Sequence, residues 1–165
     1  MEPRATRPEL PAGYGNDQPG NAVPWRRVEE WIVSARNYWL CSARPDGRPH
    51  AKPVWAFWVD GALVFSTHTR TVAGRNLAAN PEVSVHLESA EQVAILEGKV
   101  ERVRDRELLR RVSLLEEEKY GWQMGEPDPD DPNDAFYRLR PRHVLAWDGD
   151  RRIGETITRF EFPGE

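Results

Sequence analysis

The sequence predicts a mainly β protein with a few helices, folded as a small closed or partly closed antiparallel barrel. Short apolar or alternating runs recur along the chain and indicate about six strands. Turn-forming residues separate these runs at intervals of roughly 8–12 residues, as in all-β barrels. A length of 165 residues suits one domain with a single core.

The first 23 residues differ from the rest of the chain. They are rich in proline, glycine and charge and have no hydrophobic periodicity, so we expect a flexible N-terminal arm at 1–23. The barrel domain then spans 24–163. It opens with a helix after Pro24, because apolar residues recur there at helical spacing, at Val28, Trp31, Ile32 and Ala35.

Three strands are expected next, at 38–43, 50–58 and 62–66. Pro45, Asp46 and Gly47 form the first turn, because proline sets φ and glycine accepts a positive φ. Asp60 and Gly61 form the second, a strong hairpin signal. This order predicts a three-stranded antiparallel meander.

The second half alternates helices and strands. A short helix with Thr71 as N-cap is expected at 71–79, and Gly98 marks a bulge or close backbone approach within the later strand at 92–103. The remaining expected elements are strand 82–88, amphipathic helix 105–120, acidic proline-rich loop 125–133, strands 136–140 and 143–147, and a terminal alternating segment at 156–162.

Composition excludes several classes of protein. The 23 Lys and Arg against 27 Asp and Glu leave a net charge of −4, so we predict no nucleic-acid partner. No apolar run approaches the ~20 residues that span a bilayer, which predicts no membrane insertion. One cysteine, Cys41, cannot form an internal disulfide, and the N-terminus lacks a signal-peptide pattern; we expect a cytoplasmic protein.

Sequence motifs for hydrolysis, zinc binding and nucleotide binding by a P-loop or G-x-G-x-x-G turn are absent. The four histidines are scattered, so no metal site is predicted. Residues 65–77 combine hydroxyls, arginines and a helix start, with Ser66, Thr67, Arg70 and Arg75 as anion-binding candidates. From the residues alone, an N-capped helix with solvated arginines explains the same pattern.

The second candidate is the run at residues 52–58. Pro53 removes a backbone donor, which favours an edge strand against which a planar heterocycle can lie. Its aromatic rings, Trp55, Phe57 and Trp58, are equally explained as barrel core.

Together these stretches resemble the pyridoxamine 5′-phosphate oxidase-like superfamily, most closely its flavin/deazaflavin oxidoreductases. The resemblance lies in RPDGRPHAKPVWAFW at 44–58, FST at 65–67 and RNLAANP at 75–81. LEG at 96–98, KYG at 119–121, TRFEF at 158–162 and the strand at 83–88 also fit, so it covers roughly residues 25–162.

The resemblance implies an FMN-binding type of split β-barrel that forms a homodimer, with two cofactor sites at the subunit interface. It implies FMN or coenzyme F420 as cofactor, and hydride transfer by that cofactor to a small unsaturated or conjugated substrate, without a dedicated catalytic residue. The implied contacts are Lys52, Pro53, Val54 and Trp55 along the ring, Ser66, Thr67, Arg70, Arg75 and Asn76 near the phosphate, and Arg159 from the partner subunit. Pyridoxamine-phosphate oxidation itself fits less well, because no further basic cluster suits a second phosphate.

The sequence departs from the family at one point. Relatives usually carry a basic pair where this chain has Val72 and Ala73. Losing a charge-assisted phosphate contact costs about 1.5–3 kcal/mol unless Arg70 compensates. Two alternatives follow: a non-catalytic flavin- or haem-binding barrel, with His68 or His50 as haem ligand, and a scaffold without cofactor.

Overall fold

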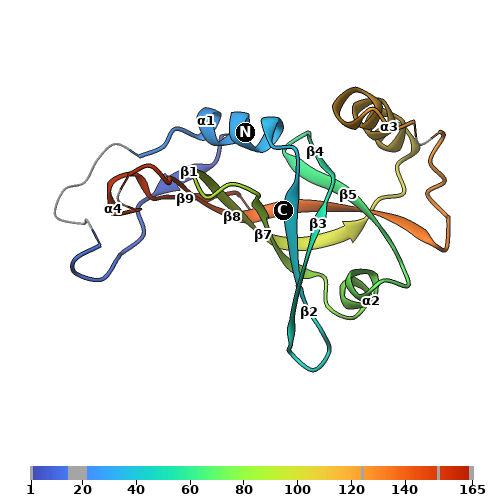
Figure 1. Cartoon of the computed structure of the whole chain (residues 1–165), viewed down its shortest axis with the longest axis horizontal. Coiled ribbons are helices and arrows are strands. Elements are labelled where there is room, and N and C mark those ends of the chain that lie inside the picture. Colours follow the sequence, from blue (N-terminus) through green and yellow to red (C-terminus); the bar gives the residue numbers. More distant parts are fainter. Residues whose placement is uncertain (1, 15–21, 124, 152, 164–165) are drawn as a thin grey trace.

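The protein, seen here as a computed structural model, is an antiparallel barrel with helices around it (Figure 1). The structure describes residues 2–14, 22–123, 125–151 and 153–163. Within them it has nine strands and four helices: β1 (Arg4–Thr6), α1 (Trp25–Ser34), β2 (Tyr38–Ala43), β3 (Pro49–Val54), β4 (Ala56–Val59), β5 (Ala62–His68), α2 (Val72–Ala79), β6 (Glu82–Leu87), β7 (Gln92–Arg102), α3 (Arg106–Tyr120), β8 (Asp134–Asp148), α4 (Ile153–Thr156) and β9 (Thr158–Glu161).

Six of these strands form the barrel wall, and the wall is open on one side. The strands pair in the order β5, β8, β7, β6, β2, β3, and β3 pairs only with β2. The second edge of β5 is covered by β4, which pairs with residues 62–65. The end of β5 at residues 66–68 is therefore unpaired on the side that faces β3. This confirms the predicted mainly β barrel and leaves a gap between β3 and the end of β5.

The predicted strand at 50–58 is two strands. Residues 49–54 pair with β2, whereas 56–59 pair with β5, and Trp55 lies between them outside the ladders. The predicted three-stranded meander is therefore wrong, because β3 has no ladder with β5. The chain changes neighbour at Trp55 because the barrel is open there, so no continuous strand can pair with β2 and β5 alike.

The two strands predicted at 136–140 and 143–147 are one continuous strand, β8. Its first part pairs with β5 and its last part with β9, while β7 runs along its other edge. The register of β7 and β8 shifts at Gly98, opposite Pro141, so the predicted bulge is confirmed. A Cβ at Gly98 would lie 2.7 Å from the carbonyl oxygen of Arg140, which explains the glycine.

The N-terminal arm is partly ordered. Predicting no regular structure for residues 1–23 was wrong for Arg4–Thr6, which pair with β9 as β1. The backbone of this segment gains sheet hydrogen bonds that hydrophobic periodicity cannot reveal. Residues 15–21 of the arm lie outside the described residues.

The helices bury the faces predicted for them. Helix α1 covers the barrel core through Val28, Trp31 and Ile32. Helix α3 packs outside the wall against β4, where a second apolar cluster joins Leu108, Leu109 and Val112 to Phe57 and Phe136. No helix among the described residues is long and apolar enough to cross a membrane.

Candidate functional site

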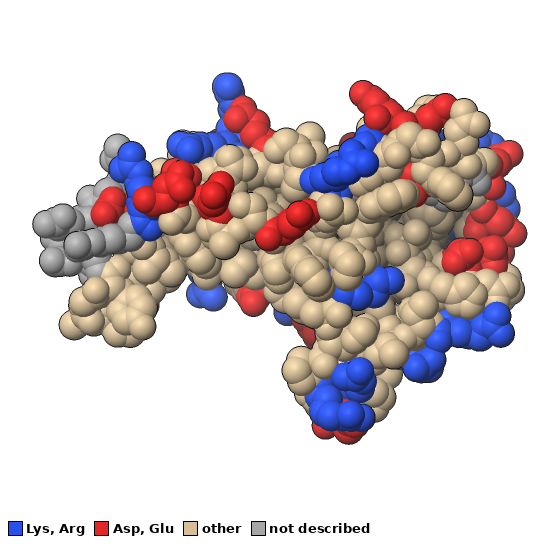
Figure 2. All heavy atoms as spheres, viewed as in Figure 1, with Lys and Arg blue, Asp and Glu red and all other residues tan. Residues whose placement is uncertain are grey.

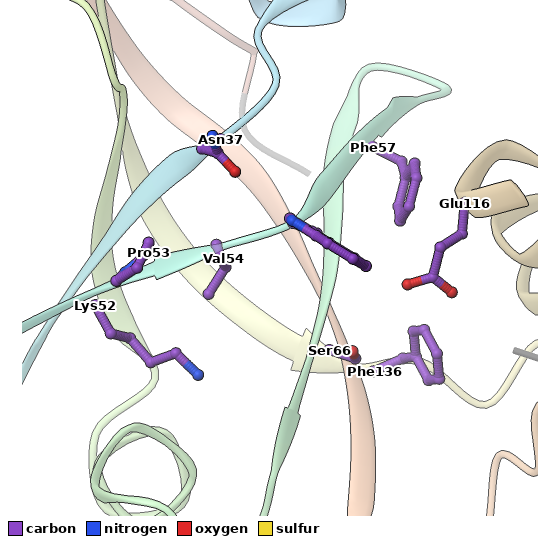
Figure 3. A pocket seen from close by; sticks show the side chains of 9 residues that line it. Asn37, Lys52, Pro53, Val54, Phe57, Ser66, Glu116 and Phe136 are labelled. Carbon is purple, nitrogen blue, oxygen red and sulfur yellow. The ribbon is translucent and has the colours of Figure 1, made fainter. Parts of the chain in front are cut away.

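A pocket of about 380 Å³ opens beside the gap in the barrel wall (Figure 3). Strand β3 forms one side, the end of β5 lies below, and α3 closes the opposite side. The lining residues are Asn37, Lys52, Pro53, Val54, Trp55, Phe57, Ser66, Glu116 and Phe136. Five of the predicted ring and phosphate residues, 52–55 and 66, are therefore brought together.

Lys52 provides a positive charge at one side of the pocket. Its Nζ donates to Thr67 Oγ1 at 3.3 Å, and that oxygen lies 3.1 Å from Thr71 Oγ1. Among the described residues no carboxylate forms an ion pair with Lys52, and burial lowers its pKa. A half-buried cation with one neutral partner is well suited to bind an anion, because the anion restores the electrostatic stabilisation that burial removed.

The strand end after Lys52 forms a flat, partly aromatic wall. Pro53 has no N–H to donate, and the outer edge of β3 has no neighbouring strand in the described fold. Trp55 is 42% exposed and stacks on Tyr120, with ring centroids 4.3 Å apart and planes 8° apart. The rings predicted together thus separate: Phe57 is core, while Trp55 faces solvent.

The loop between β5 and α2 is held by its own contacts. Thr71 Oγ1 accepts from the N–H of Gly74, which confirms the predicted N-cap. Arg75 donates from Nη1 to the carbonyl oxygen of Arg70, and the Arg70 N–H donates to His68 Nδ1. Both arginines are exposed next to the pocket without lining it, so only part of the predicted anion cradle is available to a ligand.

Two other predicted contacts lie away from the pocket. Asn76 is 2% exposed, and its Nδ2 donates to Ser42 Oγ at 3.0 Å, which ties α2 to β2. Arg159 is exposed on β9, where it is in register with Leu145 and Thr6. In Figure 1, β9 and α2 lie on opposite sides of the molecule. A contact by Arg159 from a partner subunit stays a prediction.

Val72 and Ala73, which replace the basic pair usual in relatives, are packing residues in the structure. Ala73 is fully buried and belongs to the barrel core, and Val72 is half-buried. These positions supply packing rather than positive charge. Neither His68 nor His50, the haem-ligand candidates, lines the pocket.

Sequence reasoning missed three residues that shape the site, namely Glu116, Lys119 and Tyr120 of α3. The signal for Glu116 was available, since it follows the buried Val112 by four positions on the same helix face. Lys119 Nζ donates to Tyr38 Oη at 2.9 Å and to the Ala56 carbonyl at 3.1 Å. It therefore fixes α3 to β4 behind the pocket.

We expect Lys119 to lose its proton near pH 8. Burial, with Arg36 nearby, lowers its pKa to about 8. Because this value lies below the 10.5 of an ordinary lysine, the lysine charge destabilises the fold below about pH 8, and stability rises as the pH increases from about 8 to 10.5. The measurement is an NMR titration of ¹³C-labelled lysine side chains, assigned with Lys119→Arg and Lys99→Arg. A Lys119 midpoint above about 10 would contradict the expectation.

Residues 25–148 match the family model of pyridoxamine 5′-phosphate oxidase. The chain belongs to this family. Pyridoxine/pyridoxamine 5′-phosphate oxidase from Azorhizobium caulinodans is 31% identical over an alignment of 118 residues, and the match covers 65% of this chain. The match covers 55% of that enzyme, so the chain spans about half the length of its curated relative.

Two solved structures share the fold. An F420 reductase has 23% identity and a TM-score of 0.56 over 82% of this chain and 98% of its own. A pyridoxamine 5′-phosphate oxidase-related, FMN-binding protein from Nostoc punctiforme has 17% identity and a TM-score of 0.54 over 87% and 99%. These likenesses confirm the split β-barrel.

Proposed function

We propose that this family member is an FMN- or F420-dependent oxidoreductase that transfers a hydride to a small conjugated substrate. The observation that carries the proposal is the half-buried Lys52 beside the open edge of β3, which donates to Thr67 and forms no ion pair among the described residues. An anionic cofactor with a flat ring matches both features, since its charge complements Lys52 and its ring can lie along the strand. The F420 reductase and the FMN-binding protein support the choice of cofactors.

The proposed contacts combine pocket-lining residues with the loop that follows β5. Residues 52–55 would hold the ring, and Ser66, Thr67, Arg70 and Arg75 would hold the phosphate. When bound, the cofactor supplies two-electron hydride chemistry. The chain's own task is to bind and orient it and to limit water in the pocket, of which Val54, Phe57 and Phe136 form apolar walls.

Two copies of the chain would complete the site. In one chain, Arg159 is not among the residues that line the pocket. Two large aromatic side chains are exposed at the β2–β3 hairpin: Trp39 on β2 is 38% exposed, and Trp55, directly after β3, is 42% exposed. A partner over this surface would cover both rings. Light scattering of the purified protein tests this proposal, and a monomer with full cofactor affinity would contradict it.

Fluorescence titration with FMN and with F420 tests the function itself. Binding of either at micromolar concentration, followed by oxidation of the reduced cofactor in the presence of a conjugated carbonyl compound, is the expected result. If neither cofactor binds at that concentration, the proposed function is wrong.

Arg70→Ala should weaken cofactor binding by at least about tenfold, because a charge-assisted hydrogen bond to phosphate is worth about 1.5–3 kcal/mol. The Arg70 side chain makes no hydrogen bond among the described residues, so its removal should leave the fold intact. Arg48→Ala is the matched control, since Arg48 is exposed at the β2–β3 turn and pairs with Asp46. Unchanged affinity in Arg70→Ala would place the phosphate elsewhere.

A further inference from the structure

Glu116 is a buried acid at the pocket wall without a partner. The residue is 7% exposed, and its Oε2 has no hydrogen-bond partner among the described residues. Figure 3 shows its carboxyl group directed into the pocket between Phe57 and Phe136, on the side opposite Lys52. Leaving a buried polar atom unpaired is costly, so such atoms are normally satisfied.

The surroundings of Glu116 favour its neutral form. Burial raises its pKa. Lys52 of β3 is the cation that faces it across the pocket, and Lys119, three positions later, donates instead to Tyr38 and Ala56. Tyr120, one turn later on α3, is uncharged at neutral pH; its hydroxyl donates to the Arg36 carbonyl at 2.7 Å and accepts from the Ala56 N–H at 3.2 Å. In its protonated form Glu116 can donate a hydrogen bond, and among the described residues it has no acceptor for that proton.

The pocket therefore has two distinct ends. Its Lys52 end suits an anion, whereas its Glu116 end is apolar except for one carboxyl group. On the molecular surface, Figure 2 shows charged atoms at the β2–β3 turn and over α3, with mostly uncharged atoms between these two regions. A charged ligand group would lose its hydration between Phe57 and Phe136, but an uncharged acceptor would gain the missing hydrogen bond.

We propose that Glu116 determines substrate specificity: its protonated carboxyl group donates a hydrogen bond to the carbonyl or amide oxygen of a flat, uncharged substrate. This inference rests on the proposed function, because it assigns the Lys52 end to the cofactor and the Glu116 end to the substrate. The substrate class is then neutral conjugated carbonyl compounds rather than amines or carboxylates.

Three probes of similar size test the proposed substrate class. Near neutral pH, cinnamamide is uncharged, cinnamate is an anion and cinnamylamine is a cation. Each is titrated by calorimetry into the protein saturated with cofactor. We expect cinnamamide to bind at least about fivefold more tightly than either charged probe. Its affinity should fall as the pH rises through the pKa of Glu116, because the carboxylate cannot donate.

Two substitutions at Glu116 separate recognition from packing. Glu116→Gln keeps a donor, so it should bind cinnamamide within about threefold of wild type and lose the pH dependence. Glu116→Leu removes the donor and should weaken cinnamamide by about five- to tenfold. Glu117→Gln, an exposed position on the same helix, is the matched control and should behave as wild type. Glu116→Gln is the decisive variant if Glu116→Leu fails to fold.

Four results would overturn the inference: tighter binding of cinnamylamine that depends on Glu116, unchanged cinnamamide affinity in Glu116→Leu, loss of cofactor affinity in Glu116→Gln, or no binding of any probe at millimolar concentration.

The cofactor titration of wild type is done first and separates this inference from the proposed function. If wild type binds no cofactor, the proposed function fails. The dependence of the probes on Glu116, measured on the protein as purified, then still decides the role of this residue.

Discussion

Lys52→Met is expected to weaken binding of FMN or F420 by about ten- to hundredfold, because it removes a charge-assisted contact worth about 1.5–3 kcal/mol. Lys52 is the cation that lines the pocket, and within the described chain its Nζ donates to one hydroxyl, that of Thr67. Because its charge forms no ion pair among the described residues, removing Lys52 should lower the affinity for the cofactor. Fluorescence titration of each cofactor measures it.

Stability provides an internal check on the Lys52 prediction. Burial lowers the pKa of Lys52, so its charge destabilises the folded protein below that pKa, and removing it should not lower the melting temperature. Lys99→Met is the control, since Lys99 is exposed on β7 and lies 3.8 Å from Glu82. Equal affinities for the two variants would show that the cofactor does not use Lys52.

Gly74→Ala should destabilise the protein by about 1–3 kcal/mol, although alanine favours helices more than glycine does. A Cβ at this position would lie 2.5 Å from the His68 carbonyl oxygen and 2.6 Å from that of Thr69. Both atoms belong to the backbone, so the β5–α2 loop must move and carry Arg70 with it. Urea unfolding measures the loss, and cofactor affinity should fall with it.

The control for Gly74 is Ala78→Ser, which adds one atom at an exposed position of the same helix and should stay within about 0.5 kcal/mol of wild type. A Gly74→Ala variant that is more stable than wild type would mean that helix propensity outweighs the close approach. In that case the loop can accept a side chain at position 74, and close packing does not explain why glycine occupies it.

Local signals predicted most elements correctly because their causes lie within a few residues. Asp60 and Gly61 both have positive φ, at 51° and 73°, as the predicted hairpin turn requires. Asp105 caps α3 through the N–H groups of Glu107 and Leu108. The family resemblance added the split barrel and directed attention to residues 52–55 and 66, which the structure brings into one pocket.

Pairing and burial could not be predicted in the same way, because they depend on residues far apart in the chain. Pro53 indicates an edge strand, but no residue near Trp55 indicates which neighbours its two flanking strands choose. Likewise, nothing near Asn76 indicates that Ser42 accepts its side-chain hydrogen bond. Glu116 shares the helix face of the buried Val112, but it becomes a buried acid at a pocket only when β4 and β8 place Phe57 and Phe136 beside it.

The sequence by itself determined the turn at Asp60 and Gly61, the Thr71 cap of α2, and the apolar faces of α1 and α3. The tertiary structure alone decided that the barrel stays open between β3 and the end of β5, that Lys52 lies there without an ion-pair partner among the described residues, and that the buried Glu116 lines the same pocket. The physical reason is that turns and caps are local backbone preferences, whereas an open edge and an unpaired charge exist only once distant strands have chosen their neighbours.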